Sequence, residues 1–148
     1  MIDPYRSIFI AVMGAWIGAL VLGTLAIRFW MRRLGRERTW DALQLFAPLL
    51  DLTGTWAGAL AAIALWFGRV GFGGCWAGAL GLVALMVTAS LYDRAVLMPS
   101  LEAAHKRLGA AGDEKWERDW AFLWRMAGGA RLATLLMGVS ALVLGWYA

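Results

Sequence analysis

The chain has 148 residues, of which 61% are hydrophobic and 16% charged, and its mean hydropathy is +0.64. Soluble domains average about 45–50% apolar and about 25% charged residues, so this composition excludes an ordinary water-soluble domain and indicates a protein surrounded by lipid. The formal charge of +4 belongs to basic residues that flank hydrophobic segments, which favours membrane orientation and anionic headgroups over nucleic acid as its explanation.

Four apolar segments follow one another along the chain. Each is long enough for the about 20 residues that a helix needs to cross a bilayer. The sequence therefore predicts an all-α fold, a bundle of four transmembrane helices in a single domain over residues 1–148. The short link Gly68–Gly71 should make the second and third helices a tight antiparallel hairpin. The four expected spans are residues 7–30, 45–67, 72–92 and 123–147.

The pattern Gly-x-Trp-x-Gly-Ala-Leu occurs three times, in the first, second and third spans. Glycines four apart share one side of a helix and let a neighbouring backbone approach, which favours a packing role for the pattern. The tryptophan lies about 200° away from that side and should face lipid or a second protein. The packing glycines are Gly14, Gly18, Gly54, Gly58, Gly74 and Gly78, and the outward tryptophans are Trp16, Trp56 and Trp76.

Lysine and arginine are concentrated in the first-to-second and third-to-fourth connections, whereas only Arg6 and Arg69 lie on the other side. Cytoplasmic loops carry the excess of basic residues, so both of these connections should be cytoplasmic. We therefore expect a multi-pass protein of the bacterial inner (cytoplasmic) membrane with both termini on the periplasmic or outer side.

The third-to-fourth connection is about 30 residues long and should be an amphipathic cytoplasmic segment, helical for much of its length and broken at Gly109 and Gly112. Trp116, Trp120 and Trp124 recur every four residues and so share one helix face. This face has two interpretations: an anchor in the headgroup region or a ridge that docks a partner.

Asp51 and Arg131 are charged residues inside expected spans, where an unpaired charge is costly. Each shares a helix face with small residues and lies at a similar depth, so we expect the two to pair inside the bundle. Arg28, Asp93 and Arg94 could extend the network. The pair could fix helix register, form an anion or proton site, or be close by chance.

Catalysis and metal binding have little support in the sequence. There is one cysteine, Cys75, and one histidine, His105, too few ligands for a protein-built metal site. We expect Cys75 to pack as a small apolar residue and His105 to be solvated in the cytoplasmic connection. No nucleophile with a general base is evident, so no catalytic residue, metal or cofactor is predicted.

The layout of the chain combines three features: a basic first loop, FAPLLDLTGTWAGAL in the second span and LYDRAVLMPSLEAAHKRL after the third. It resembles small bacterial four-helix membrane families that include the copper-resistance D membrane domain and HemJ-type protoporphyrinogen oxidases. The resemblance implies a four-helix inner-membrane bundle, with haem or copper handling in some members. The HemJ-type pattern has a histidine in the first span, which is absent here, so no site residue is carried over.

The leading hypothesis is a non-enzymatic accessory, scaffolding or assembly subunit of a larger respiratory or photosynthetic membrane complex. Its expected partners are the lipid bilayer and other membrane subunits, or further copies of itself. The alternative is a small transporter or membrane enzyme that handles a lipophilic or anionic substrate at Asp51 and Arg131.

Overall fold

The computed structural model describes residues 4–111 and 114–147, without the side chains at 36, 47, 48, 51, 109–111 and 114–116. These residues are almost entirely helical and contain no strand, which confirms the all-α expectation. The elements are α1 (Pro4–Phe67), the 3₁₀ turn η1 (Gly73–Cys75), α2 (Trp76–Tyr92), the π-helical turn η2 (Asp93–Leu97), α3 (Met98–Ala111) and α4 (Glu114–Tyr147).

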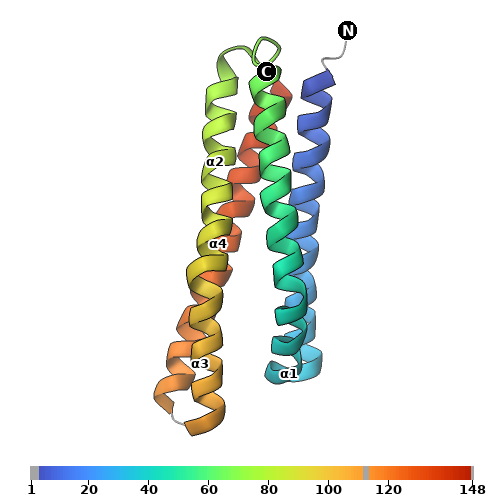
Figure 1. Cartoon of the computed structure of the whole chain (residues 1–148). Coiled ribbons are helices and arrows are strands. Elements are labelled where there is room, and N and C mark those ends of the chain that lie inside the picture. The colour runs from blue at the N-terminus through green and yellow to red at the C-terminus, as the bar shows by residue number, and fades with distance from the viewer. Residues whose placement is uncertain (1–3, 112–113, 148) are drawn as a thin grey trace.

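Helix α1 is folded back on itself at Gly35, the one residue inside it with non-helical backbone angles (φ 78°, ψ 178°). A positive φ is readily adopted only by glycine. The first arm (residues 4–34) and the second arm (residues 36–67) therefore lie side by side and antiparallel (Figure 1). The arms contact each other at several levels, including Tyr5 against Phe67 and Trp30 against Phe46.

A short turn joins the second arm to α2, as the sequence predicted. The Gly68 amide donates to the Ala64 carbonyl at 2.9 Å, and the Gly71 amide donates to the Gly68 carbonyl at 2.8 Å. Both chain termini lie at this end of the molecule, which we call the terminal end; the opposite end is the Gly35 end (Figure 1).

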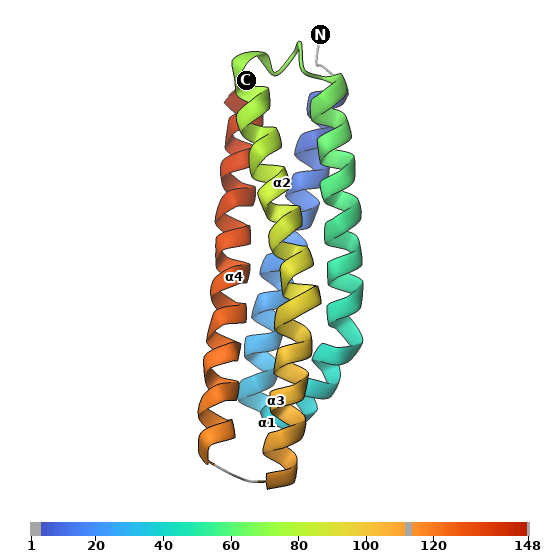
Figure 2. The same cartoon turned by 60° about the vertical axis from the view of Figure 1, so that its left-hand side comes forward.

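Helices α2 and α3 form one continuous rod through the π-helical turn η2 (Figure 2). Pro99 lies just beyond η2 and has no amide to donate to residue 95. The Met98 amide instead bonds to the Asp93 carbonyl, one residue further back than in an α-helix. A local π-turn thus accompanies Pro99, and the helix continues after it.

The interior contains two apolar clusters stacked along the long axis. The cluster near the terminal end includes Phe9, Met13, Trp16, Leu65, Phe72, Val83, Met86 and Ala141. The cluster near the Gly35 end includes Ile27, Trp40, Leu43, Leu97, Leu101, Trp120 and Ala127. Polar side chains lie in the layer between the two clusters, and this layer contains the candidate site.

The third-to-fourth connection is helical for much of its length, as expected, because it is built from the end of the α2–α3 rod and the start of α4. The break expected at Gly109 is wrong, since the helix continues through this residue, and Gly112 lies outside the described residues. The first-to-second connection is also helical, apart from the kink at Gly35. These segments extend the bundle because their apolar residues complete the second cluster. Trp120, expected on a face that anchors in the headgroup region or docks a partner, is only 8% exposed and stacks on Trp124 with ring centroids 5.1 Å apart.

Three helices in the described chain are long and apolar enough to cross a membrane: Pro4–Gly35, Gly73–Leu108 and Glu117–Tyr147. The apolar part of the second arm, Leu52–Phe67, is shorter. These lengths agree with a membrane protein.

Candidate functional site

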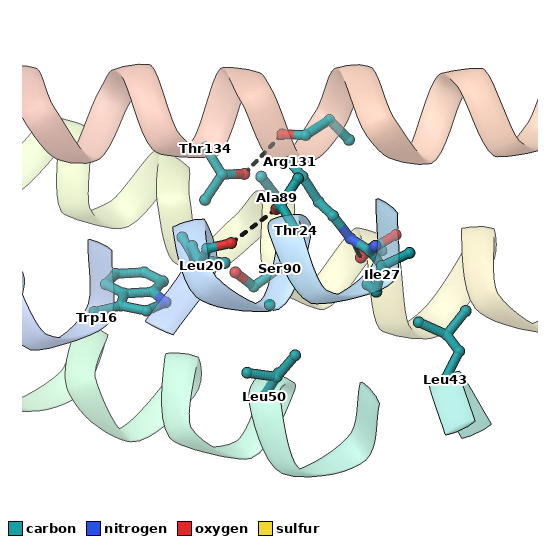
Figure 3. Close-up of a pocket in the computed structure, with 13 residues that line it drawn as sticks. Trp16, Leu20, Thr24, Ile27, Leu43, Leu50, Ala89, Ser90, Arg131 and Thr134 are labelled. Carbon is teal, nitrogen blue, oxygen red and sulfur yellow. Dashed lines mark hydrogen bonds and ion pairs between the residues drawn. The ribbon is translucent and has the colours of Figure 1, made fainter. Parts of the chain in front are cut away.

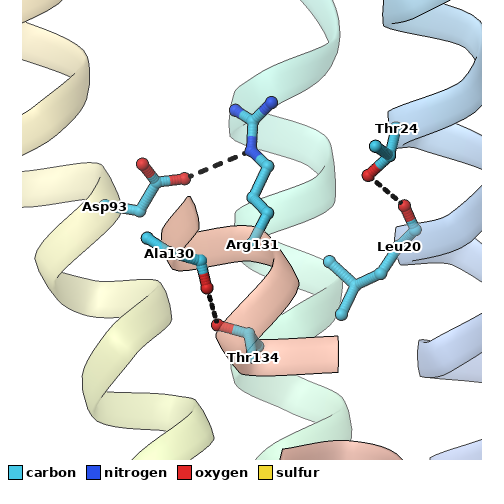
Figure 4. Close-up of polar contacts among 6 residues, drawn as sticks. All are labelled: Leu20, Thr24, Asp93, Ala130, Arg131 and Thr134. Atoms are coloured by element: carbon cyan, nitrogen blue, oxygen red, sulfur yellow. Dashed lines mark hydrogen bonds and ion pairs between the residues drawn. The ribbon is translucent and has the colours of Figure 1, made fainter. Parts of the chain in front are cut away.

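The polar layer is centred on an ion pair between two helices. Arg131 of α4 places its Nε 3.6 Å from Oδ2 of Asp93 in η2 (Figure 4). The Arg131 and Asp93 side chains are only 22% and 11% exposed. The π-turn begins at Asp93, so the backbone irregularity associated with Pro99 coincides with the position that carries this carboxylate.

Two threonines line the same layer and hydrogen bond to their own helices. The Thr24 hydroxyl donates to the Leu20 carbonyl at 2.7 Å, and the Thr134 hydroxyl donates to the Ala130 carbonyl at 2.9 Å (Figure 4). Such bonds to the preceding turn use the hydroxyl proton and leave the oxygen as an acceptor. Both threonines can therefore accept hydrogen bonds from a guest in the layer.

A cavity of ≈ 50 Å³ lies beside the ion pair (Figure 3). At about 10–15 Å³ per water molecule it can hold only a few waters. Oδ1 of Asp93 is buried without a hydrogen-bond partner among the described residues, so it is available to a water in this space. The lining includes Trp16, Thr24, Leu50, Ser90, Asp93, Arg131 and Thr134.

The network expected around Asp51 and Arg131 is only partly visible. The side chain of Asp51 lies outside the described residues, so its pairing with Arg131 stays a prediction. Arg131 meets Asp93 instead, one of the residues expected to extend the network. Arg94 is exposed and does not line the cavity, and Arg28 lines a neighbouring groove.

The small-residue face of α4 is buried, as predicted from its spacing. Thr134 and Ala141 are among the buried residues, and Gly138 and Gly145 are buried too. A Cβ on Gly138 would lie 2.9 Å from Cε of Met86, so α2 and α4 approach closely there. This face sets the depth at which Arg131 enters the bundle.

The three copies of the glycine pattern behave differently. Gly54 and Gly58 of the second arm are buried, and Val87 of α2 occupies the space where a Gly58 side chain would go. Leaving aside neighbouring residues of the same helix or turn, nothing in the described chain lies within 4 Å of the Cβ position at Gly14, Gly18 or Gly74, and Leu144 lies 3.5 Å from that position at Gly78. Close packing is thus observed for both glycines of the second copy alone.

The outward position expected for the pattern tryptophans is wrong for Trp16, which is 4% exposed. Its indole Nε1 lies 3.1 Å from the Cβ position of Gly54, so the second-copy glycine receives the first-copy tryptophan. Trp56 is 65% exposed, as expected. Trp76 is half-buried against Trp66. The side chain of Trp116 lies outside the described residues.

His105 was expected to be solvated but is partly buried. Its ring stacks on Trp40 with centroids 4.8 Å apart, and its Nδ1 is buried without a hydrogen-bond partner within the described chain. Helix α3 continues the α2 rod, which brings this histidine against α1. No group of three or more His, Cys, Asp or Glu residues that could hold a metal occurs in the described part.

A larger groove runs between the first arm of α1 and α4, with a volume of ≈ 580 Å³. Arg131 and Thr24 line both this groove and the small cavity, so they form the boundary between the two spaces. Neither space was expected from the sequence, because both depend on how far apart the first arm and α4 stand at this depth.

Comparison of the chain with protein-family models, curated proteins and solved structures finds no match. The sequence-based resemblance to small four-helix membrane families therefore stays an expectation, and function must be argued from the site and the surface.

Proposed function

We propose that the chain is a multi-pass protein of the bacterial inner membrane in which both arms of α1, the α2–α3 rod and α4 all cross the bilayer. The second arm is supported as a fourth crossing by its contacts with the first arm at Tyr5–Phe67, Trp16–Gly54 and Trp30–Phe46. Basic residues gather toward the Gly35 end, with only Arg6 and Arg69 at the terminal end, so we place the termini on the outer side.

Within that membrane we propose a non-catalytic role as an accessory or assembly subunit of a larger complex. The observation that carries this proposal is Trp56, which is 65% exposed on the second arm. It lies 11 residues before the end of α1 at Phe67, or about 16 Å along a helix, near the middle of an about 30 Å hydrocarbon core. Tryptophans that anchor a protein in lipid prefer the interfaces instead.

Trp56 belongs to a continuous apolar stripe on the outward face of the second arm. The residues are spaced by three and four positions, which keeps them on one side of the helix. A transmembrane helix of another subunit can pack along such a stripe, with the tryptophan as a large central contact. The members are Leu45, Leu49, Leu52, Trp56, Leu60, Ile63 and Phe67, all of them exposed.

Extraction in a mild detergent tests the subunit role. A stoichiometric membrane partner should copurify with the chain and be lost from Trp56→Ala. Trp146→Ala is the matched control, because Trp146 is similarly exposed but lies at the terminal end, and it should keep the partner. A particle containing one copy of this chain alone would reject the proposal, and one containing only several copies would replace it by homo-oligomerisation.

The second candidate function is handling of a lipophilic or anionic substrate at the intramembrane charges. It is favoured by the position of Arg131, which lines the wide groove and the small cavity. Under this function Arg131→Gln should abolish biological activity while the protein remains in the membrane, and Trp56→Ala should be tolerated. The subunit role predicts loss of activity for Trp56→Ala.

A further inference from the structure

The groove between the first arm and α4 changes character along its length. Val21 and Leu25 of the first arm and Leu132 and Leu135 of α4 line its part toward the terminal end. Arg28 and Arg125 line the part toward the Gly35 end. Over the about 10–15 Å that separates these levels at 1.5 Å per residue, the groove passes from an apolar channel to a basic mouth.

The charge at this mouth is not neutralised by the described part of the chain. The groove lining contains three arginines and no aspartate or glutamate. Arg131 is occupied by Asp93, whereas neither Arg28 nor Arg125 lies within ion-pair distance of a described carboxylate. Arg125 donates from Nε to the Ala121 carbonyl at 3.3 Å, which leaves its terminal nitrogens for an anion.

Two consecutive glycines open the groove on the α4 side. Apart from the adjacent turns of α4 itself, no atom of the described residues lies within 4 Å of the Cβ position at Gly128 or Gly129, so neither glycine is required for close helix packing. Larger side chains at these positions would project into the groove, between its basic mouth and its apolar part.

We propose that this groove binds one anionic membrane phospholipid, with the headgroup phosphate between Arg28 and Arg125 and an acyl chain along Val21, Leu25 and Leu132. Arginine suits phosphate because its planar guanidinium presents paired donors. The volume of ≈ 580 Å³ falls within the range of about 300–1,000 Å³ typical of ligand sites. The inference rests on the proposed membrane placement and is independent of the subunit role.

Native mass spectrometry of the detergent-purified chain, titrated with phosphatidylglycerol or phosphatidylcholine, tests the site. We expect one phosphatidylglycerol to bind preferentially. The double variant Arg28→Gln/Arg125→Gln should weaken this binding by about thirtyfold, the combined effect of two basic residues on an anionic lipid. Arg33→Gln is the matched control, since Arg33 is exposed, lies over the Phe29 ring and does not line the groove, and it should leave binding unchanged.

A second variant fills the groove without touching charge. Gly128→Leu should abolish the lipid adduct while preserving the thermal midpoint, because leucine has open space there and is a better helix former than glycine. Gly14→Leu, at another open helical glycine, should keep the lipid. Equal binding of the two phospholipids, or undiminished phosphatidylglycerol binding by folded Gly128→Leu and the double arginine variant, would overturn the proposal. Copurification of a protein partner plays no part in these outcomes.

Discussion

Asp93 and Arg131 meet in a nearly closed layer between two apolar clusters, so each depends on the other for charge compensation. Removing one partner from such a pair leaves an uncompensated charge in a poorly solvated place, whereas removing both does not. The pair is therefore better tested by comparing single and double variants than by either substitution alone.

We expect Asp93→Asn and Arg131→Gln each to lower the free energy of unfolding in detergent by about 2 kcal/mol. This is less than the about 3–5 kcal/mol of fully buried, tightly bonded pairs, because the nitrogen and oxygen are 3.6 Å apart and the guanidinium is 22% exposed. The double variant should be more stable than the sum of the single effects indicates. Additive losses would contradict a direct interaction.

The control for this experiment is Glu102→Gln, which breaks the exposed pair with Lys106 one turn away on α3. Its effect should be no more than about 0.5 kcal/mol. The same cycle with Asp51→Asn and Arg131→Gln tests the pairing predicted from sequence. Coupling in that cycle as well would place three charges in one network.

At the scale of the helices, identical sequence patterns have different structural roles. Gly18 and Gly58 are the second glycines of two copies, yet only Gly58 faces a neighbouring helix, where Val87 fills the adjacent space. Which copy packs closely depends on the rotation of each helix in the bundle. The glycine pattern does not determine that rotation. The sequence therefore identified a packing motif but not which of its copies packs closely.

Gly58→Leu should therefore lower the free energy of unfolding by about 1–3 kcal/mol, the usual effect of overfilling a packed contact. Gly18→Leu should be neutral or slightly stabilising, because its side chain has open space and leucine favours the helix. Chemical unfolding of both variants in the same detergent measures the difference. Equal losses would mean that the two helix faces are equivalent.

The α2–α3 rod is a second case in which the sequence indicates a local feature but not its structural outcome. A proline in the sequence marks an irregularity, but at Pro99 the local outcome is a π-turn rather than a helix end. A proline interrupts one backbone bond, and the neighbouring apolar contacts of Leu97 and Leu101 decide whether the helix resumes. Those contacts come from other helices, so a local pattern could not supply them.

For the molecule as a whole, composition was the most informative signal, because the excess of apolar residues predicts long lipid-compatible helices independently of their arrangement. The buried face of α4 followed from the spacing of its small residues. The Asp93–Arg131 contact and the groove did not follow, since both depend on distances between helices. Gly35 was also missed, although a glycine within a run of arginines was the available signal.

The proposed topology can be checked with the single cysteine of the chain. Cys75 lies in η1 at the terminal end and is half-buried, so a membrane-impermeant maleimide should label it in intact spheroplasts. In a Cys75→Ser background, Arg33→Cys near Gly35 should react only after the membrane is permeabilised. Labelling of Arg33→Cys without labelling of Cys75 in intact spheroplasts would reverse the orientation. Labelling of both sites would place them on the same side and reject the single crossing of the second arm between them.

The reversal at Gly35 also bears on biogenesis. With one residue rather than a loop between the arms, the two cannot enter the bilayer as separately spaced helices. In the proposed topology the arginines on either side of Gly35 keep the bend on the cytoplasmic side, and we expect the second arm to insert alongside the first. The proposed topology therefore predicts that the two arms insert together, as one helical hairpin.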